Sequence, residues 1–287
     1  MLDIPNPRQI LETLLPHLKV AAAYAQQIQH GIANHPDKYD SDNFFANALT
    51  DADLSIQTFV EVALLAHFPQ IRFHGEEYEK SYNTKYFRAI DLGPQGDYLV
   101  TLDPIDGTQF YMDGHANYQI ILTILNADQF EAVLAMSPAQ QIYYYALRDQ
   151  GTFVGRLRDR LEDCQRLTVE TPKNNVLLGW DMGYLAEHLP EPYHAISVQT
   201  DYSQTAQIPN VNGLLTGDLA GAILARGKFI DGAALAFMAR EMGYWVTAHD
   251  GSALPPLYAC RDYEWPGLVI GASPTVHQDL VAAIRNA

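Results

Sequence analysis

The most decisive stretch of this chain reads Asp103-Pro104-Ile105-Asp106-Gly107-Thr108 and directly follows the apolar run 98–102. It sets two carboxylates three residues apart at the end of what is expected to be a buried strand. Carboxylates held this closely repel each other unless a cation neutralises them, and oxygen ligands favour Mg2+ or Mn2+ over zinc. The stretch therefore predicts a metal site, with Gly107 and the Thr108 amide available to a phosphate. Asp-Pro and Asp-Gly pairs also occur in ordinary turns, so a plain turn is the competing interpretation.

Two further regions place acids at the ends of predicted elements. Glu76 and Glu77 follow a short strand expected over 71–74, with Gly75 before them. Asp231 precedes a helix expected over 232–242 and stands where an N-cap side chain would stand. Ordinary turns do not require acids at three such places, which favours the metal site over the turn.

Composition limits the function classes. The chain has 287 residues, 48% of them hydrophobic, and a net charge of −16. Such a charge disfavours nucleic acids and anionic membrane surfaces as partners, and no apolar stretch is long enough to predict a membrane span. The first residues lack the pattern of a secretory signal. Cys164 and Cys260 have no metal-ligand spacing, so we expect reduced thiols in a cytoplasmic protein.

The first half of the chain predicts helices followed by closely spaced strands. An N-terminal helix is expected over 7–30 with a kink at Pro16, then a loop over 34–45 and a helix over 51–68. Residues Ile56, Phe59, Val60, Ala63 and Leu64 form the apolar face expected for the second helix. Strands are expected over 71–74, 97–102, 119–125, 131–136, 141–147 and 152–154. Their short connections favour an antiparallel sheet.

The second half alternates between predicted strands and helices, which favours an α/β arrangement. Strands are expected over 176–180, 195–199, 244–248 and 268–271, and helices over 182–189, 214–226, 232–242 and 274–285. The change in pattern predicts two domains, 1–155 with most metal ligands and 156–287 with Asp231 and the substrate contacts.

The order and spacing of the three acidic regions resemble the inositol monophosphatase family. The likeness extends from about residue 49 to about residue 251, and its most specific part is the hexapeptide 103–108. It implies an α/β fold made of an α+β half and an α/β half, layered as the α/β/α/β/α sandwich of the inositol monophosphatase and fructose-1,6-bisphosphatase type. It also implies a Mg2+-dependent, lithium-sensitive phosphatase of small soluble phosphate esters, and a possible homodimer.

The resemblance further implies a role for each acid. Glu76, Asp103 and the Ile105 carbonyl would hold one Mg2+ ion, and Asp103, Asp106 and Asp231 a second, with Glu76 able to hold a third, so that two or three Mg2+ ions, or Mn2+, are expected. Asp106, Gly107, Thr108 and Asp231 would contact the phosphate ester. Thr108 and Asp53 would orient the attacking water, with Glu76 as a further catalytic residue. The alternative for Asp53 is a structural role, in which an acid in the first turn of a helix interacts favourably with the helix dipole.

The sequence departs from the family mainly where substrate specificity is expected. Gln57 and Ile230 stand where an acid and a tryptophan are usual, and region 210–230 lacks the usual Gly-Ser-Ala-Ala start. Inositol 1-phosphate is therefore only a default substrate, and bisphosphate nucleotidase, fructose-1,6-bisphosphatase and histidinol-phosphatase activities stay open. It also stays open that the protein binds metal without catalysing a reaction. A haloacid-dehalogenase-type phosphatase is disfavoured, because its two acids stand two residues apart in the sequence, whereas Asp103 and Asp106 stand three apart.

Overall fold

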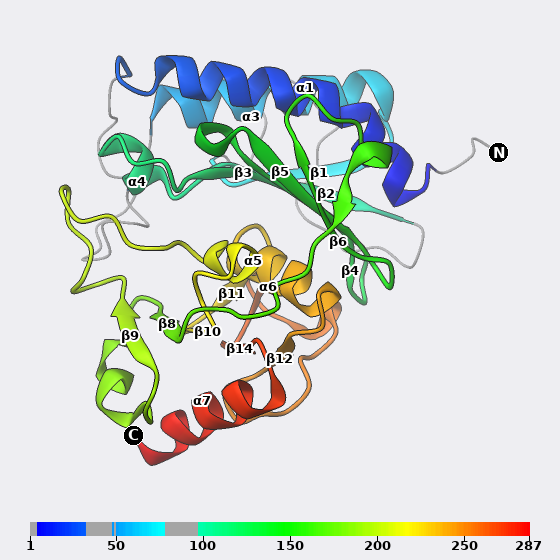
Figure 1. Cartoon of the computed structure of the whole chain (residues 1–287). Coiled ribbons are helices and arrows are strands. Elements are labelled where there is room, and N and C mark those ends of the chain that lie inside the picture. The colour runs from blue at the N-terminus through cyan, green and yellow to red at the C-terminus, as the bar shows by residue number, and fades with distance from the viewer. Residues whose placement is uncertain (1–4, 33–47, 49, 78–96) are drawn as a thin grey trace. The chain divides into compact units, whose positions relative to one another are not determined.

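The computed structural model describes residues 5–32, 48, 50–77 and 97–287. The loop expected over 34–45 lies outside the described residues. The chain forms two compact units, Met1–Arg148 with Phe153–Gln165 and Asp149–Thr152 with Arg166–Ala287. Each unit combines helices with a sheet, as the α/β class predicts (Figure 1). The domain boundary expected at residue 155 stays a prediction.

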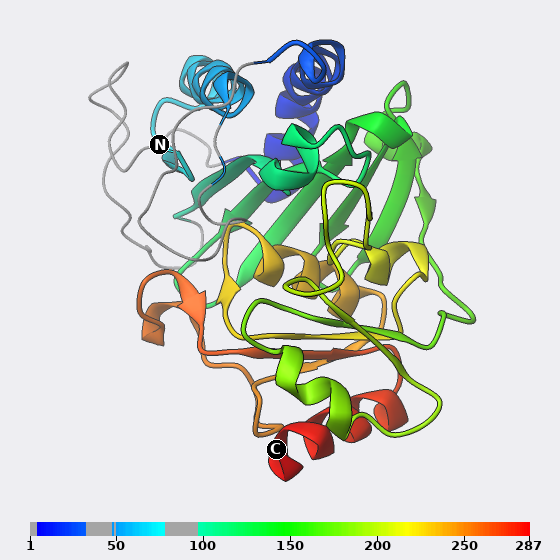
Figure 2. The same cartoon turned by 90° about the vertical axis from the view of Figure 1, so that its left-hand side faces the viewer.

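Two long helices of the first unit cover one face of its sheet (Figures 1 and 2). Helix α1 spans Pro7–Ile28 and α3 spans Asp51–His67. A capping box begins α1, in which Asn6 Oδ1 accepts a hydrogen bond from the Gln9 amide at 2.9 Å. The helix continues through Pro16 without a break, although proline removes one backbone hydrogen bond. Burial of its inner face outweighs that loss.

In the described residues, the sheet of the first unit has seven strands in the order β1-β2-β3-β4-β5-β6-β7. The β1–β2 pair is parallel, and β2 through β5 pair antiparallel. The strands are β1 Arg72–Gly75, β2 Leu99–Asp106, β3 Gln119–Leu125, β4 Phe130–Ser137, β5 Ile142–Leu147, β6 Gly151–Arg156 and β7 Gln165–Arg166. Strand β2 is longer than expected and runs through the acidic motif as far as Asp106.

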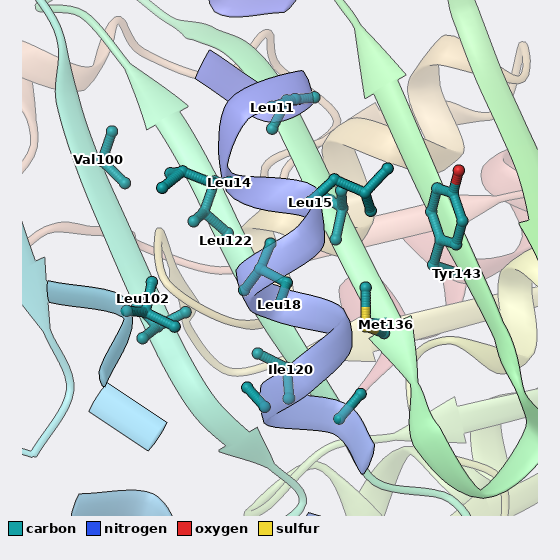
Figure 3. Packing of buried hydrophobic residues seen from close by; sticks show 14 of the residues in the cluster. Leu11, Leu14, Leu15, Leu18, Val100, Leu102, Ile120, Leu122, Met136 and Tyr143 are labelled. Carbon is teal, nitrogen blue, oxygen red and sulfur yellow. The ribbon is translucent and has the colours of Figure 1, made fainter. Parts of the chain in front are cut away.

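The core of the first unit lies between α1 and the sheet (Figure 3). Figure 3 shows apolar side chains of α1 lying against side chains from β2, β3, β4 and β5. The labelled residues are Leu11, Leu14, Leu15, Leu18, Val100, Leu102, Ile120, Leu122, Met136 and Tyr143. Each fully buried leucine or isoleucine contributes about 1.5–3 kcal/mol to stability. This packing fixes which face of β2 points away from the helices.

The described residues of the second unit form a five-stranded sheet in the order β12-β14-β10-β8-β9. Helix α7, Pro274–Asn286, packs on one face of this sheet and α6, Gly232–Glu241, on the other (Figure 1). The strands are β8 Asn175–Leu178, β9 His194–Ser197, β10 Gly221–Leu224, β12 Trp245–Thr247 and β14 Leu268–Gly271. Strands β11 Gly227–Lys228 and β13 Glu264–Trp265 form a separate pair.

Short helices fill several connections in both units. They are α4 Thr108–Met112, α5 Gly213–Thr216 and the 3-10 turns η1 Pro138–Gln140, η2 Leu161–Asp163, η3 Gly183–His188 and η4 Leu257–Ala259. The helix expected over 182–189 is the 3-10 turn η3. None of the helices in the described parts of the chain is both long and apolar enough to cross a membrane.

The prediction of a helix over 214–226 is wrong, because a short helix and a strand occupy this segment. Helix α5 ends after Thr216 because Gly217 adopts a left-handed conformation with φ 79°. Strand β10 follows and pairs with β8 and β14 in the middle of the sheet. A Cβ on Gly221 would lie 2.7 Å from the Ile270 carbonyl oxygen, so the strands approach closely only at a glycine. The apolar pattern of residues 214–226 does not predict this close contact with a distant part of the chain.

Candidate active site

A bulge in β2 brings the two carboxylates of the motif onto one face of the sheet. Asp103 pairs with Ile121 and Asp106 with Gln119, and the register shifts between them. Side chains two residues apart on β3 point to the same face, so their partners on β2 share that face as well. Without the extra residue, acids three positions apart on a strand would point to opposite faces. The sequence alone does not reveal this bulge.

Glu76 reaches the same end of the sheet from β1. The parallel register pairs Gly75 with Leu102, and the Glu76 amide continues the ladder by donating to the Leu102 carbonyl at 3.1 Å. One further step of this register sets Glu76 beside Asp103. The sheet face that carries Asp103 is opposite to the face of Leu102, which packs in the helix-covered core.

Asp53 and Thr108 contact each other, although they stand 55 residues apart in the chain. The Thr108 hydroxyl shares its one proton between the Ile105 carbonyl, at 2.8 Å, and Asp53 Oδ1, at 3.3 Å. Asp53 Oδ2 accepts from the amide and the hydroxyl of Thr50, at 2.8 and 2.6 Å. Thr50 and Asp53 thus form the capping box of α3. The Asp53 side chain is completely buried, so these bonds hold its carboxylate in one orientation.

Gln57 connects α3 to the end of β1, a role that the sequence did not reveal. Its Oε1 accepts a hydrogen bond from the Glu77 amide at 2.9 Å, and its side chain is buried. A Cβ on Gly75 would lie 2.2 Å from the Gln57 side chain, so only glycine leaves room for it. The segment Gly75–Glu77 is therefore held by Gln57, at the position where the resemblance predicts an acid.

Two contacts hold the end of the motif. Gln119 Nε2 donates to Asp106 Oδ2 at 2.6 Å, which fixes the second carboxylate against β3. Gly107 has φ 84°, a left-handed conformation that glycine adopts readily, and it turns the chain into α4. The Tyr111 hydroxyl of α4 donates to the Ala25 carbonyl of α1 at 2.7 Å. Burial raises the pKa of the Tyr111 phenol well above its ordinary value, so it stays a protonated donor.

Asp231 lies in the second unit and is described there by itself. It is the N-cap residue of α6, as expected, and its side chain accepts a hydrogen bond from the Gly232 amide. Its other carboxylate oxygen lies 3.9 Å from Lys228 Nζ. Whether Asp231 joins the acids of the first unit stays a prediction.

The donor set fits a hard divalent cation in its chemistry. Carboxylate oxygens of Glu76, Asp103 and Asp106 and the Ile105 carbonyl are the ligand types that Mg2+ and Mn2+ prefer. The Ile105 carbonyl also has a second lone pair beside the one used by Thr108. Within residues 5–32, 48, 50–77 and 97–287, no three His, Cys, Asp or Glu side chains form a group that could hold a metal ion. The case for a metal site therefore depends on the types of donor atom and on the strand register that places them at one end of the sheet.

One family model and two curated proteins match this chain. The model of the inositol monophosphatase family matches residues 10–287. A 3'(2'),5'-bisphosphate nucleotidase, CysQ, from Haemophilus influenzae is 27% identical over 43% of this chain and 42% of its own length. A putative Nus factor, SuhB, from Neisseria meningitidis is 24% identical over 61% of this chain and 62% of its own length. The chain thus matches less than two thirds of the length of these relatives.

Solved structures share the fold over nearly the whole chain. A Thermotoga maritima IMPase has a TM-score of 0.71 at 16% identity and covers 96% of both chains. An IMPase/NADP phosphatase in complex with Mg2+ and phosphate has a TM-score of 0.66 at 18% identity, over 96% of this chain and 94% of its own. Identities this low establish the fold alone, and they confirm the expected α/β class of layered helices and sheets.

Proposed function

The chain belongs to the inositol monophosphatase family, and from that premise we propose that it hydrolyses a small phosphate monoester with the help of Mg2+. The observation that carries this proposal is the bulge in β2, which sets Asp103 and Asp106 on one sheet face while Thr108 contacts the buried Asp53. Such an arrangement supplies both anionic ligands for a cation and an oriented hydroxyl for a water molecule.

The chain's own residues would divide the work as follows. Glu76, Asp103 and Asp106, with the Ile105 carbonyl and Asp231, would hold two or three cations and, through them, the phosphate. When bound, the cations would lower the pKa of the attacking water and stabilise the leaving oxygen. The amides of Gly107 and Thr108 would donate to phosphate oxygens.

Thr108 and Asp53 would guide the proton of the attacking water. The Thr108 oxygen can accept this proton while its own proton passes to Asp53, 3.3 Å away. The Thr50 hydroxyl, at 2.6 Å from Asp53, keeps the carboxylate aimed at Thr108. The water oxygen then bonds to phosphorus as the ester oxygen leaves, and the leaving alcohol is protonated from solvent.

A panel of phosphate esters tests the proposal. Purified protein would be incubated with inositol 1-phosphate, fructose 1,6-bisphosphate, histidinol phosphate and adenosine 3',5'-bisphosphate, with Mg2+ or with a chelator, and released phosphate measured. We expect Mg2+-dependent release from at least one ester, and none from an Asp103→Asn variant prepared in parallel. Release that persists without divalent cations, or equally in the variant, would contradict the proposal.

A bisphosphate nucleotidase is the second candidate. The first relative named above is such an enzyme, at 27% identity over 43% of this chain. In the panel, preference for adenosine 3',5'-bisphosphate over inositol 1-phosphate would select this candidate. Complete inactivity on every ester, together with Mg2+ binding, would favour the non-catalytic relative.

A further inference from the structure

Two histidines from different helices face each other at the other end of α3. His17 of α1 and His67, the last residue of α3, stand 50 residues apart in the chain, and their Nε2 atoms lie 3.3 Å apart. The ring centroids are 5.4 Å apart, so the nitrogens approach each other more closely than the rings do. Both imidazoles thus present the same nitrogen to one point between the helices.

This spacing suits two ligands of one metal ion. Imidazole nitrogens that lie 2.0–2.1 Å from a tetrahedral ion are about 3.3 Å apart, the separation found here. A direct N–H···N hydrogen bond between neutral rings is the competing explanation, and 3.3 Å is long for such a bond. Imidazole pairs favour Zn2+, Ni2+ and Cu2+ over Mg2+.

Neighbouring aromatic rings help to hold both imidazoles. Phe59 of α3 packs edge-on against His17 with 5.9 Å between centroids, and Phe68 lies 6.3 Å from His67. Phe59 was expected in the apolar face of α3 but is 39% exposed, and its contact with His17 accounts for its position.

We propose that His17 and His67 form a second metal site, which binds one borderline transition-metal cation such as Zn2+, Ni2+ or Cu2+ and joins α1 to α3. Water would complete the coordination, because the described residues offer no third His, Cys, Asp or Glu ligand there. The site is distinct from the candidate active site. His67 stands fourteen residues after Asp53 in α3, roughly 20 Å along the helix axis.

Calorimetric titration of the whole protein with Zn2+ tests this site. With the candidate active site saturated by Mg2+, we expect one Zn2+ ion bound per chain, with affinity at least tenfold weaker in His17→Ala and in His67→Ala. His194→Ala is the matched control, because His194 is exposed and lies on β9 in the other unit. Unchanged Zn2+ affinity in both site variants would overturn the proposal, as would an equal loss in the control.

Two further measurements separate metal binding from a structural role of the pair. Ligand binding to the folded state raises Tm, by about 5 °C for a chain of this size when the cation is at a hundredfold its Kd. We expect this rise with Zn2+ in the wild type, not with Mg2+, and not in either variant. Electron paramagnetic resonance of bound Cu2+ should show coupling to two nitrogens in the wild type and to one in each variant. A pair that is only hydrogen-bonded would lose stability on substitution and show neither signal.

The same variants distinguish a failure of the proposed histidine metal site from a failure of the proposed phosphatase activity. Neither histidine belongs to the candidate active site, so Mg2+-dependent phosphate release should be unchanged in His17→Ala and His67→Ala. Loss of Zn2+ binding with normal hydrolysis would support this site alone, whereas absent hydrolysis with normal Zn2+ binding would count against the phosphatase alone.

Discussion

The two ends of α3 offer different chemistry to cations. Its first turns carry Asp53 and Gln57, whose oxygens face Thr108 and the Glu77 amide. Its last residue, His67, offers a nitrogen to His17. Oxygen donors select hard ions such as Mg2+, and imidazole nitrogens select softer ones. One helix can therefore take part in two kinds of site, and a change at one end can be checked against the cation chemistry of the other.

The largest effect is expected from Asp103→Asn. This change removes the charge of a proposed metal ligand in the candidate active site and should lower phosphate release by about a thousandfold or more, since cation-mediated charge stabilisation contributes several kcal/mol. Asparagine keeps the size of the side chain, so Tm should stay close to that of the wild type. The Zn2+-induced rise in Tm at the histidine end should be retained. Turnover within tenfold of the wild type would contradict the role of Asp103.

Lithium should act at the candidate active site and not at the histidine pair. The family resemblance predicts that Li+ in the millimolar range competes for a Mg2+ position, because both are small, hard ions. Most of the phosphate release should be lost, and raising Mg2+ should restore part of it. Zn2+ binding to His17 and His67 should not change, since imidazole has little affinity for Li+. Hydrolysis that is indifferent to Li+ would argue against close kinship with lithium-sensitive members.

A smaller effect is expected from Gly75→Ala. The added methyl group would fall 2.2 Å from the Gln57 side chain, which must then move and give up its hydrogen bond to the Glu77 amide. Loss of a buried hydrogen bond and crowding together cost about 1–3 kcal/mol. Chemical unfolding should show this loss, and apparent Mg2+ affinity should fall as Glu76 shifts.

A double-mutant cycle identifies the cause of that loss. If the clash with Gln57 is responsible, Gly75→Ala should cost less free energy of unfolding in a Gln57→Ala background than in the wild type. Equal costs in both backgrounds would show that Gly75 matters for its backbone conformation rather than for the room it leaves.

Features that depend on a short sequence motif could be predicted, whereas features that depend on contacts between distant segments could not. The family and the α/β class could be predicted, because the hexapeptide 103–108 is compact and specific. The family resemblance also paired Asp53 with Thr108, and the structure brings these two side chains into contact. The capping box that Thr50 forms with Asp53 was not predicted, because the sequence analysis gave Asp53 only a first-turn position as its structural role. The helix over 214–226 failed, since close contact at Gly221 decides that segment. The bulge at 103–106 and the His17–His67 pair depend on strand register and helix packing, which no single segment encodes.

The smallest effect is expected from Thr50→Ala at the beginning of α3. The variant loses the N-cap of α3, which costs about 1 kcal/mol of unfolding free energy. It also removes the hydroxyl that lies 2.6 Å from Asp53 Oδ2, so the carboxylate gains freedom to turn away from Thr108. We expect kcat to fall while the KM for the ester changes little, because Thr50 does not touch the substrate in the proposed arrangement. Thr50→Ser keeps the hydroxyl and should restore both stability and kcat. If serine restores stability but not kcat, the orientation of Asp53 through Thr50 is not what limits turnover.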